Sequence, residues 1–478
     1  MRKNKYDIII IGCGSAGLSV GLFMNKVGLK VLMISRDERS IGGDCLNEGC
    51  VPSKAFIHIA KIVHAAKESK YFGLSTTGEV NIDKAVEYIY GKQEIIREHE
   101  NVNWLREQGI DVVLGDASFS GKDSVEIEGT SFTGKKIVIA TGSRPKKLNL
   151  HGIEHLTYYD NQNIFHLKSL PERLLVIGGG PIGIEIAQAM CRLGSKVTVV
   201  HKSDHILEHD DIHISSILVN QLEKEGIEFI FNANTEGFTN NKEAIIRLKD
   251  GQIRKIECDA IFVGIGRYLE LETLQLNNAG IEIRQNKIIV DKYLRTTNKN
   301  IFVCGDVAGS LQFSHAAEFQ ARILLNNFFS PIKKSLNNDH MSWVTFTDPQ
   351  VATFGLSEKD LKGRHIPYEK LEQNFEHDDR AIVDNYQYGK LILYISPKRF
   401  LTMQRILGGT MICPNAGELI QELILANINN LPIEAIFNKI YAYPVSSRIN
   451  QKIIVQYKQK SLTKRMIRIL QIAYKLFH

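Results

Sequence analysis

Short apolar runs that lead into glycine-rich turns occur twice along this chain. The first run, residues 6–11, leads into Gly12-Cys13-Gly14-Ser15-Ala16-Gly17. The second, residues 173–177, leads into Gly178-Gly179-Gly180-Pro181-Ile182-Gly183. Each turn is followed by a helical pattern and another apolar run, at residues 30–34 and 196–200. This repeated strand–turn–helix–strand pattern predicts two doubly wound α/β domains.

The glycines of both turns have the spacing of a dinucleotide-binding fingerprint. The first glycine permits the tight turn, the second lets the backbone approach a pyrophosphate, and the third lets the helix pack on the strand. The N-terminus of the helix then faces the phosphates. One such turn is weak evidence, but both turns here follow a strand and open a helix. We therefore expect two Rossmann-like dinucleotide-binding domains, with cofactor contacts at Gly12, Gly14, Gly17, Gly178, Gly180 and Gly183.

The pattern changes beyond Asp339. Short β-like runs at residues 343–346 and 390–395 precede a helical pattern at residues 416–427, which predicts a separate α+β domain. Residues 331–338 are polar and charged, as expected of a linker.

Composition and charge narrow the functional class. The 478 residues have 44% hydrophobic and 23% charged side chains, as in globular proteins. A net charge of +6 over this length does not indicate nucleic-acid binding. Seven cysteines are too few, and odd in number, for a secreted disulfide framework. No stretch approaches the roughly 20 apolar residues of a membrane span. We expect a cytoplasmic protein, in which a close cysteine pair is catalytic or metal-binding.

The pair Cys45 and Cys50 is the strongest chemical signal. The two cysteines stand five positions apart within residues 42–54, before an apolar-periodic stretch at residues 55–66 that reads as a helix. A thiolate near a helix N-terminus is stabilised by the helix dipole, so its pKa falls. A buried thiol pair without function and a zinc half-site are the alternatives, but zinc ligands at the required spacing are missing. We predict a redox-active pair and no metal site.

The segment Gly42-Gly43-Asp44-Cys45-Leu46-Asn47-Glu48-Gly49-Cys50 resembles the signature of the class I pyridine nucleotide–disulfide oxidoreductases. That family includes dihydrolipoamide dehydrogenase, glutathione reductase and mercuric reductase. The resemblance covers residues 5 to about 455, with matching motifs at residues 139–145, 297–306, 345–355 and 415–418. The Gly-Gly-Asp-Cys variant and residues 344–349 and 379–381 are most similar to the mercuric reductase-like branch.

This resemblance implies the domain organisation of a homodimer. It implies an FAD-binding domain built from residues 1–149 and 266–338 and an NAD(P)-binding domain at residues 150–265. A dimerisation domain at residues 339–456 and a basic tail at residues 457–478 follow.

The resemblance also implies an electron path. Hydride passes from the nicotinamide to FAD and then to a Cys45–Cys50 disulfide, with Cys50 as the flavin-side thiolate and Cys45 as the exchanging thiol. Lys54 and Glu185 match the pair beside the flavin ring, where the lysine would stabilise negative charge on reduced flavin. An ordinary interdomain salt bridge is the alternative. Further cofactor contacts are implied at Ser35 (where the family usually has glutamate), Gly43, Thr141, Gly142, Gly266 and Asp306.

The residues after the second nucleotide-binding unit bear on the choice of nicotinamide. NAD sites place an acid after the second strand, whereas NADP sites place basic groups there. This chain has His201 and Lys202 at that point, and Lys202 can meet a 2′-phosphate. The fingerprint also continues to Ala187 rather than to glycine, as in glutathione reductase-like members. We predict NADP in preference to NAD, the alternative being that both residues are solvated loop residues.

The C-terminal region departs from the disulfide-reducing members. Their histidine–glutamate pair is replaced by Tyr443 and Arg448. Tyrosine, with a pKa of about 10, is a poor base at neutral pH, and such proton transfer contributes roughly 10²–10⁴-fold. This argues for a small-molecule or metal-ion acceptor. No cysteine follows Cys413 and no N-terminal metal-binding module is present, so inefficient handling of mercuric ion is expected.

These observations leave three functions open. The first is a mercuric reductase-like oxidoreductase that uses FAD and NAD(P)H. The second is a dihydrolipoamide dehydrogenase with an altered proton shuttle. The third is a redox flavoprotein without turnover that docks a partner or a membrane through its tail.

The tail itself shows an amphipathic helical pattern at residues 461–478. It is compatible with contact to a membrane surface or a partner, or with packing on the protein's own dimer. The apolar positions are Leu462, Met466, Ile469, Leu470, Ala473, Leu476 and Phe477, and the opposite positions are Lys464, Arg468, Gln471, Lys475 and His478.

Overall fold

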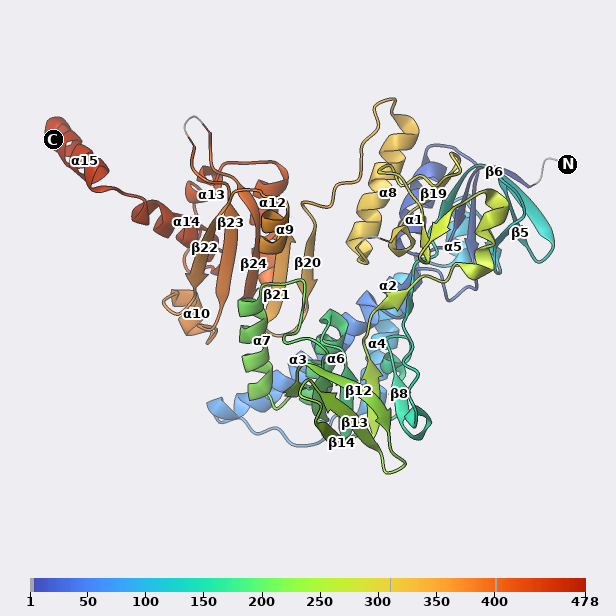
Figure 1. Cartoon of the computed structure of the whole chain (residues 1–478), viewed down its shortest axis with the longest axis horizontal. Helices are drawn as coiled ribbons and strands as arrows, with labels where there is room; N and C mark the ends of the chain where they lie inside the picture. Colours follow the sequence, from blue (N-terminus) through green and yellow to red (C-terminus); the bar gives the residue numbers. More distant parts are fainter. Residues whose placement is uncertain (1–3, 310, 400–401) are drawn as a thin grey trace. The chain divides into compact units, whose positions relative to one another are not determined.

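The computed structural model describes residues 4–309, 311–399 and 402–478. The chain divides into two units, Met1–Asp204 with Glu225–Asn337 and His205–Lys224 with Asn338–His478 (Figure 1).

The first unit contains a mostly parallel sheet built around β1 (Lys5–Ile11). Its residues Ile8–Ile11 are almost completely buried, because the strand is covered on both faces and therefore reads as a continuous apolar run. Helices α1 (Ser15–Lys26) and α8 (Ser314–Phe329) pack side by side in this unit (Figure 1). In spatial order the sheet contains β3 (Asp111–Leu114), β2 (Val31–Ser35), β1, β6 (Thr130–Ile139), β5 (Ser124–Ile127) and β4 (Ser118–Phe119), and β19 (Ile301–Val303) pairs with β6.

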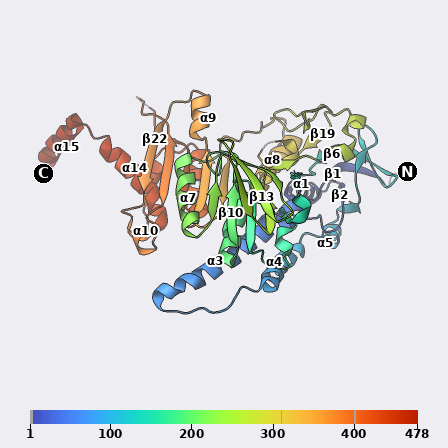
Figure 2. The ribbon, with the colours of Figure 1, turned by 60° about the horizontal axis from the view of Figure 1, so that its bottom comes forward.

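A second, fully parallel sheet follows in the same unit. Its central strand β9 (Arg173–Ile177) runs into the second glycine turn and then into α6 (Pro181–Leu193). The antiparallel strands β12 (Ala233–Phe238), β13 (Glu243–Leu248) and β14 (Ile253–Glu257) lie beside it (Figure 2). The expected pair of doubly wound units is thus confirmed. The order of the parallel strands is β11 (Glu228–Ile230), β10 (Lys196–Val200), β9, β15 (Ala260–Val263) and β8 (Thr157–Tyr159).

The C-terminal unit contains a five-stranded antiparallel sheet with helices, which confirms the expected α+β domain. Its core includes the buried residues Phe354, Leu393 and Met411. The strand order is β20 (Ser342–Thr345), β21 (Gln350–Gly355), β24 (Ile406–Cys413), β23 (Lys390–Ile395) and β22 (Glu369–Asn374). The helices are α9 (Glu358–Gly363), α10 (Asp379–Val383), α11 (Ala416–Leu419), α12 (Gln421–Ile428), α13 (Glu434–Phe437), α14 (Ile449–Lys460) and α15 (Lys464–Phe477).

Helix α7 (Ile212–Lys224) belongs to this C-terminal unit and packs on β24 (Figure 1). The turn before it is held by Asp210, whose carboxylate accepts hydrogen bonds from Trp343 Nε1 at 3.0 Å and Thr353 Oγ1 at 2.5 Å. Burial raises the pKa of Asp210. The helix lies within the range expected for the nucleotide-binding domain, and the expected domain bounds stay a prediction.

Two expected helices have different bounds in the structure. The helix expected at residues 55–66 is α3 (Cys50–Glu68) and begins five residues earlier, since Pro52 is tolerated in a first turn. The helical pattern at residues 416–427 is divided into α11 and α12, with Ile420 between them. The earlier start of α3 makes Cys50 its first residue, and the short helix α2 (Gly43–Asn47) carries Cys45.

Candidate active site

The first glycine turn has the shape that a bound dinucleotide requires. Gly12 has a φ of +109°, and a Cβ there would lie 2.3 Å from the Ala140 carbonyl oxygen. The turn also approaches the start of α2 so closely that a Cβ at Gly43 would lie 2.6 Å from the Gly14 Cα. A side chain at Gly12 or Gly43 would collide with these backbone atoms, so glycine is required for the close turn before the N-terminus of α1. The residues therefore fit FAD, whose pyrophosphate would meet that helix end.

The second glycine turn has the same design. A Cβ at Gly178, where φ is +115°, would lie 2.4 Å from the Gly264 carbonyl oxygen. A Cβ at Gly183 would lie 2.3 Å from the Gly178 carbonyl oxygen, so only glycine allows α6 to pack this closely. At Gly180, by contrast, a Cβ would meet no atom within 4 Å. The open space at the N-terminus of α6 fits the pyrophosphate of a nicotinamide dinucleotide.

The predicted cysteine pair is brought together at the adjoining ends of α2 and α3. Cys45 is half-buried and Cys50 is exposed, both are thiols, and their side chains are hydrogen-bonded to each other. Ser314, the first residue of α8, lies with its hydroxyl oxygen 3.4 Å from Cys50 Sγ. Cys50 therefore has two side-chain partners, one of which the sequence did not indicate.

The environment divides the two thiols into one that is acidic and one that is not. The Cys45 hydrogen bond, the Ser314 hydrogen bond and the positive charge of Lys54 lower the pKa of Cys50 to about 6. The hydrogen bond to Cys50 and burial raise the pKa of Cys45. At neutral pH the reduced pair consequently holds a Cys50 thiolate and a Cys45 thiol. A thiolate at the first residue of α3 is further favoured by the helix dipole.

Lys54 and Glu185 form the expected ion pair within the first unit. Lys54 Nζ lies 2.9 Å from Glu185 Oε2, and the glutamate side chain is only 4% exposed. Lys54 stands one turn after Cys50 on α3, and Glu185 stands on α6 just after the second glycine turn. The pair thus joins the helix of the redox cysteines to the helix of the second nucleotide turn. A lysine cation fixed in this way would be suited to stabilising negative charge on a flavin ring bound beside it.

Arg267 links several residues around the cysteines, and sequence reasoning missed it. Its Nη2 donates to Asp44 Oδ1 at 3.1 Å, and its Nε donates to Ser143 Oγ at 2.6 Å. Ser143 in turn donates to Asp306 Oδ2 at 2.5 Å. Burial raises the pKa of Asp306, and Ser143 and Arg267 oppose that effect. The signal in the sequence was a basic residue directly after Gly266, whose φ is +105°.

The other residues expected at the flavin occupy strand ends and turns. Ser35 ends β2, is buried, and donates its hydroxyl hydrogen to the Asp37 carbonyl at 2.8 Å. Thr141 and Gly142 follow β6, where Gly142 has a φ of +71°. Their contacts to a cofactor stay predictions.

His201 and Lys202 are placed differently from each other. His201 is buried, and its Nδ1 accepts a hydrogen bond from the Gly179 backbone N–H at 3.0 Å. The imidazole thus holds the backbone of the second glycine turn. Lys202 is exposed just after β10. Of the two, Lys202 is therefore the side chain that is free to turn toward a ribose phosphate.

Tyr443 belongs to the C-terminal unit, whereas the cysteine pair belongs to the first unit. It is 67% exposed, and its hydroxyl donates to Asp379 Oδ2 at 3.1 Å. This hydrogen bond raises the pKa of Tyr443. The Arg448 guanidinium lies 5.5 Å from the Tyr443 ring centroid. Tyr443 is accordingly a neutral hydroxyl at neutral pH and cannot serve as a base.

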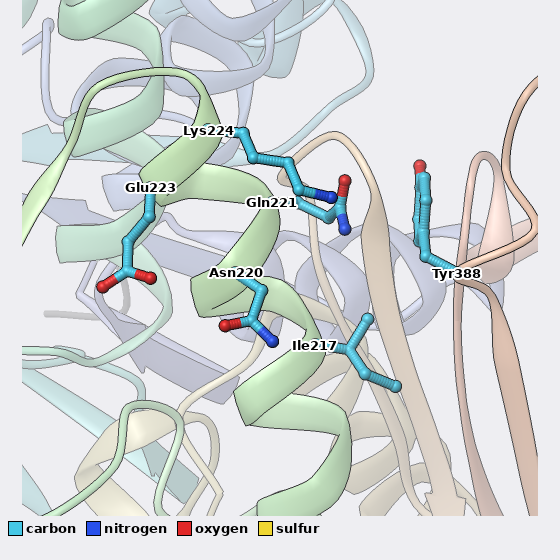
Figure 3. A pocket seen from close by; sticks show the side chains of 6 residues that line it. All are labelled: Ile217, Asn220, Gln221, Glu223, Lys224 and Tyr388. Atoms are coloured by element: carbon cyan, nitrogen blue, oxygen red, sulfur yellow. The ribbon is translucent and has the colours of Figure 1, made fainter.

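A surface pocket lies within the C-terminal unit (Figure 3). It contains no thiol and none of the expected site residues. Its lining residues are Ile217, Asn220, Gln221, Glu223, Lys224 and Tyr388.

Metal-binding clusters and membrane-spanning helices are both absent from residues 4–309, 311–399 and 402–478. Among those residues no group of three or more His, Cys, Asp or Glu side chains is arranged to hold a metal ion. Within the same ranges no helix is both long and apolar enough to cross a membrane.

Comparison with known proteins agrees with this geometry. Residues 6–321 match the family described as pyridine nucleotide-disulphide oxidoreductase, and residues 341–453 match its dimerisation domain. A mercuric reductase from Staphylococcus aureus is 30% identical over 92% of this chain and 80% of its own length. A dihydrolipoyl dehydrogenase from Mycoplasma pneumoniae is 32% identical over 92% of this chain and 95% of its own.

A solved structure is similar over nearly its whole length. It is the Cu(II) complex of the HOCl-induced flavoprotein disulfide reductase RclA from Escherichia coli, with a TM-score of 0.82 and 26% identity over 95% of this chain and 99% of that chain. The matched dimerisation domain supports a homodimer. Relatives with different activities match at similar identity, so they establish the family and its cofactors, FAD and NAD(P)H. This chain belongs to the pyridine nucleotide-disulfide oxidoreductase family and is an FAD-dependent enzyme of that family.

Proposed function

We propose that this enzyme passes electrons from NADPH, in preference to NADH, through FAD and the Cys45–Cys50 disulfide to a thiol-binding metal ion, as a mercuric reductase-like enzyme. When bound, FAD would accept hydride from NADPH and pass an electron pair to the disulfide. Two electrons and one proton then convert the disulfide into a Cys50 thiolate and a Cys45 thiol. The observation that carries the proposal is this asymmetric pair combined with a Tyr443 that cannot take up a proton.

The proposed class of electron acceptor rests on the absence of a catalytic base at Tyr443. Thiol–disulfide exchange requires a group that removes the proton from Cys45 and returns one to the leaving thiolate. Hydrogen bonding to Asp379 raises the pKa of Tyr443, so the hydroxyl keeps its proton at neutral pH and no tyrosinate is present to act as a base. A metal ion needs no such shuttle, because it accepts electrons without a leaving thiolate. Reduction of a divalent ion to the metal consumes the two electrons of one nicotinamide, and reduction to a monovalent ion consumes one.

The ligand chemistry supports the same class of acceptor. Thiolate ligands favour soft ions, and the two sulfurs of Cys45 and Cys50 are adjacent. Binding of the ion would displace the remaining proton from Cys45. The names of the relatives agree, since one is a mercuric reductase and a solved neighbour is a Cu(II) complex. Without a delivery cysteine after Cys413, transfer of the ion to the pair is expected to limit the rate.

The preference for NADPH rests on the residues after β10. Buried His201 is engaged with the glycine turn, and it replaces the carboxylate that an NAD site would present to the ribose. Exposed Lys202 supplies a positive charge that a 2′-phosphate would meet.

A second candidate is dihydrolipoamide dehydrogenase activity with an altered shuttle. The Tyr443–Asp379 hydrogen bond is the observation in its favour, because a carboxylate orients the side chain at the position of the family's histidine. The two functions differ in their acceptors.

The test is an acceptor screen on the FAD-loaded enzyme with NADPH under anaerobic conditions. We expect oxidation of NADPH with Hg²⁺ or Cu²⁺ in the presence of an exogenous thiol, at least about tenfold faster than with lipoamide or glutathione disulfide. Cys45→Ser and Cys50→Ser should abolish it. Faster turnover of lipoamide than of the ions would favour the second candidate. An absence of turnover with every acceptor would contradict both enzymatic functions and favour a redox flavoprotein without turnover.

A further inference from the structure

The positive charge of this protein is concentrated at its C-terminal end. Nine of the 59 Lys and Arg residues, and none of the 53 Asp and Glu residues, lie after Glu434. Residues 1–434 consequently carry a small net negative charge, whereas all Asp, Glu, Lys and Arg side chains in the last 44 residues are basic ones. Such a division of charge is typical of proteins that contact an anionic surface with one end.

The last helix, α15 (Lys464–Phe477), combines this charge with an apolar face. The structure describes all of its residues, and none of them is buried. Figure 1 shows it beyond α14, apart from the sheet of its own unit. Ile469, Leu470 and Phe477 are 55%, 57% and 82% exposed. At 100° per residue these side chains share one face with Met466, Ala473 and Leu476, whereas Lys464, Arg468, Gln471 and Lys475 share the opposite face.

The helix is poorly suited to stand alone in water. Isolated helices of about 12–15 residues are marginal, and Lys464 and Arg465 place positive charge in the first turn, where the helix dipole disfavours it. Only the Thr463 side chain, which accepts the Met466 N–H at 3.2 Å, caps this end. Anionic groups close to the first turn would relieve the repulsion, and an apolar medium would cover the opposite face.

Charge also decides between the possible occupants of the apolar face. A second copy of α15 would cover the apolar face, but it has no Asp or Glu and would leave the basic face without a counter-charge. A lipid surface that contains anionic headgroups supplies both the negative charge and the apolar layer.

We propose that α15 lies in the interface of an anionic lipid bilayer and thereby binds the enzyme peripherally to the membrane surface. Its apolar face enters the acyl boundary, and its basic residues contact the headgroups. This proposal is independent of the electron acceptor, so either one can fail alone.

The test is co-sedimentation of the FAD-loaded full chain with vesicles of phosphatidylcholine alone or mixed with phosphatidylglycerol. We expect binding to the mixed vesicles and at least about tenfold weaker binding to the neutral ones, with a decrease at high salt. Leu470→Glu and Gln471→Glu add the same charge at neighbouring positions on opposite faces. Leu470→Glu should abolish binding, whereas Gln471→Glu should weaken it only about fivefold.

A chain that ends at Ser461 keeps α14 and should not bind, although its NADPH oxidation should be unchanged. Three results would overturn the proposal. The first is no binding of the full chain to mixed vesicles, and the second is equal loss in both glutamate variants. The third is a change of oligomeric state in Leu470→Glu without vesicle binding by the unaltered chain, which would assign the face to a subunit contact.

Discussion

Cys50 Sγ lies 3.4 Å from the hydroxyl oxygen of Ser314, and the two residues are 264 positions apart in the chain. A Cys50 thiolate can accept a hydrogen bond from this hydroxyl as well as from the Cys45 thiol. The contact therefore joins the N-termini of α3 and α8 at the sulfur that is expected to face the flavin. It gives the acidity of Cys50 a cause that can be removed by a single substitution.

Replacing Ser314 by Ala should raise the pKa of Cys50. Because Cys50 is a thiolate above its pKa of about 6, the charge-transfer absorbance of the two-electron-reduced enzyme should disappear as pH falls through about 6. Losing one hydrogen bond to the charged form should move this midpoint upward by about one pH unit. The measurement is a pH titration of the long-wavelength band. Ser314→Thr keeps the hydroxyl and should keep the midpoint, and an unchanged midpoint in Ser314→Ala would exclude the hydrogen bond as a cause.

Replacing Lys54 by Gln should slow reduction of the flavin. The substitution removes the cation 2.9 Å from Glu185, which is expected to lie beside the flavin ring, so negative charge that develops on the ring would lose its counter-charge. The expected decrease in the rate of flavin bleaching by NADPH is about 10²-fold, measured by stopped-flow absorbance. Lys61→Gln removes an exposed lysine from the same helix and serves as the control. Equal rates in both variants would show that the ion pair has only a structural role.

Installing the histidine–glutamate pair of the disulfide-reducing relatives should change the choice of acceptor. In the double variant Tyr443→His, Arg448→Glu, an imidazole replaces a hydroxyl whose pKa Asp379 raises. We expect turnover with lipoamide to increase by about 10²-fold and turnover with metal ions to change little. Tyr443→Phe, which lacks a proton to donate, should not gain lipoamide activity. If Tyr443→Phe loses metal-ion turnover, the hydroxyl takes part in a step that the proposed path does not contain.

Reversing the charge at Lys202 should weaken the preference for NADPH. Lys202→Glu places a carboxylate after β10, where it would repel a 2′-phosphate and accept hydrogen bonds from a ribose diol. The KM for NADPH should rise at least about tenfold, and the KM for NADH should change less. The exposed Lys196, at the start of the same strand, provides the control variant Lys196→Glu. A uniform effect on both nicotinamides would place Lys202 outside the nucleotide site.

Arg267 should contribute to holding FAD through its contacts with Asp44, Ser143 and, through Ser143, Asp306. Arg267→Ala should weaken FAD binding by about tenfold or more, measured by the flavin fluorescence released on dilution. Arg267→Lys keeps the charge but not the two-directional donor geometry, so we expect an intermediate effect. Full retention of FAD by Arg267→Ala would limit the network to positioning α2.

The strand–turn–helix units, the cysteine pair and the Lys54–Glu185 contact could be predicted because each depends on local spacing or on a familiar motif. Ser314, Arg267 and Asp379 could not, because their roles depend on which distant elements the fold brings together. The place of α7 was hidden for the same reason, since Asp210 is held by Trp343 and Thr353 of a much later segment. His201 was recognised as the replacement for an acid. Its hydrogen bond with the Gly179 backbone N–H could not be predicted, because it depends on the pairing of β10 with β9.

The most direct test of the electron path is an anaerobic titration of the FAD-loaded enzyme with NADPH, followed by absorbance. Communication between the flavin and the Cys50 thiolate predicts a long-wavelength charge-transfer band after the first electron pair and full bleaching only after the second. Cys50→Ser should remove the band and leave a one-pair titration. Bleaching of the unaltered enzyme by a single electron pair without the band would contradict the path through Cys45 and Cys50.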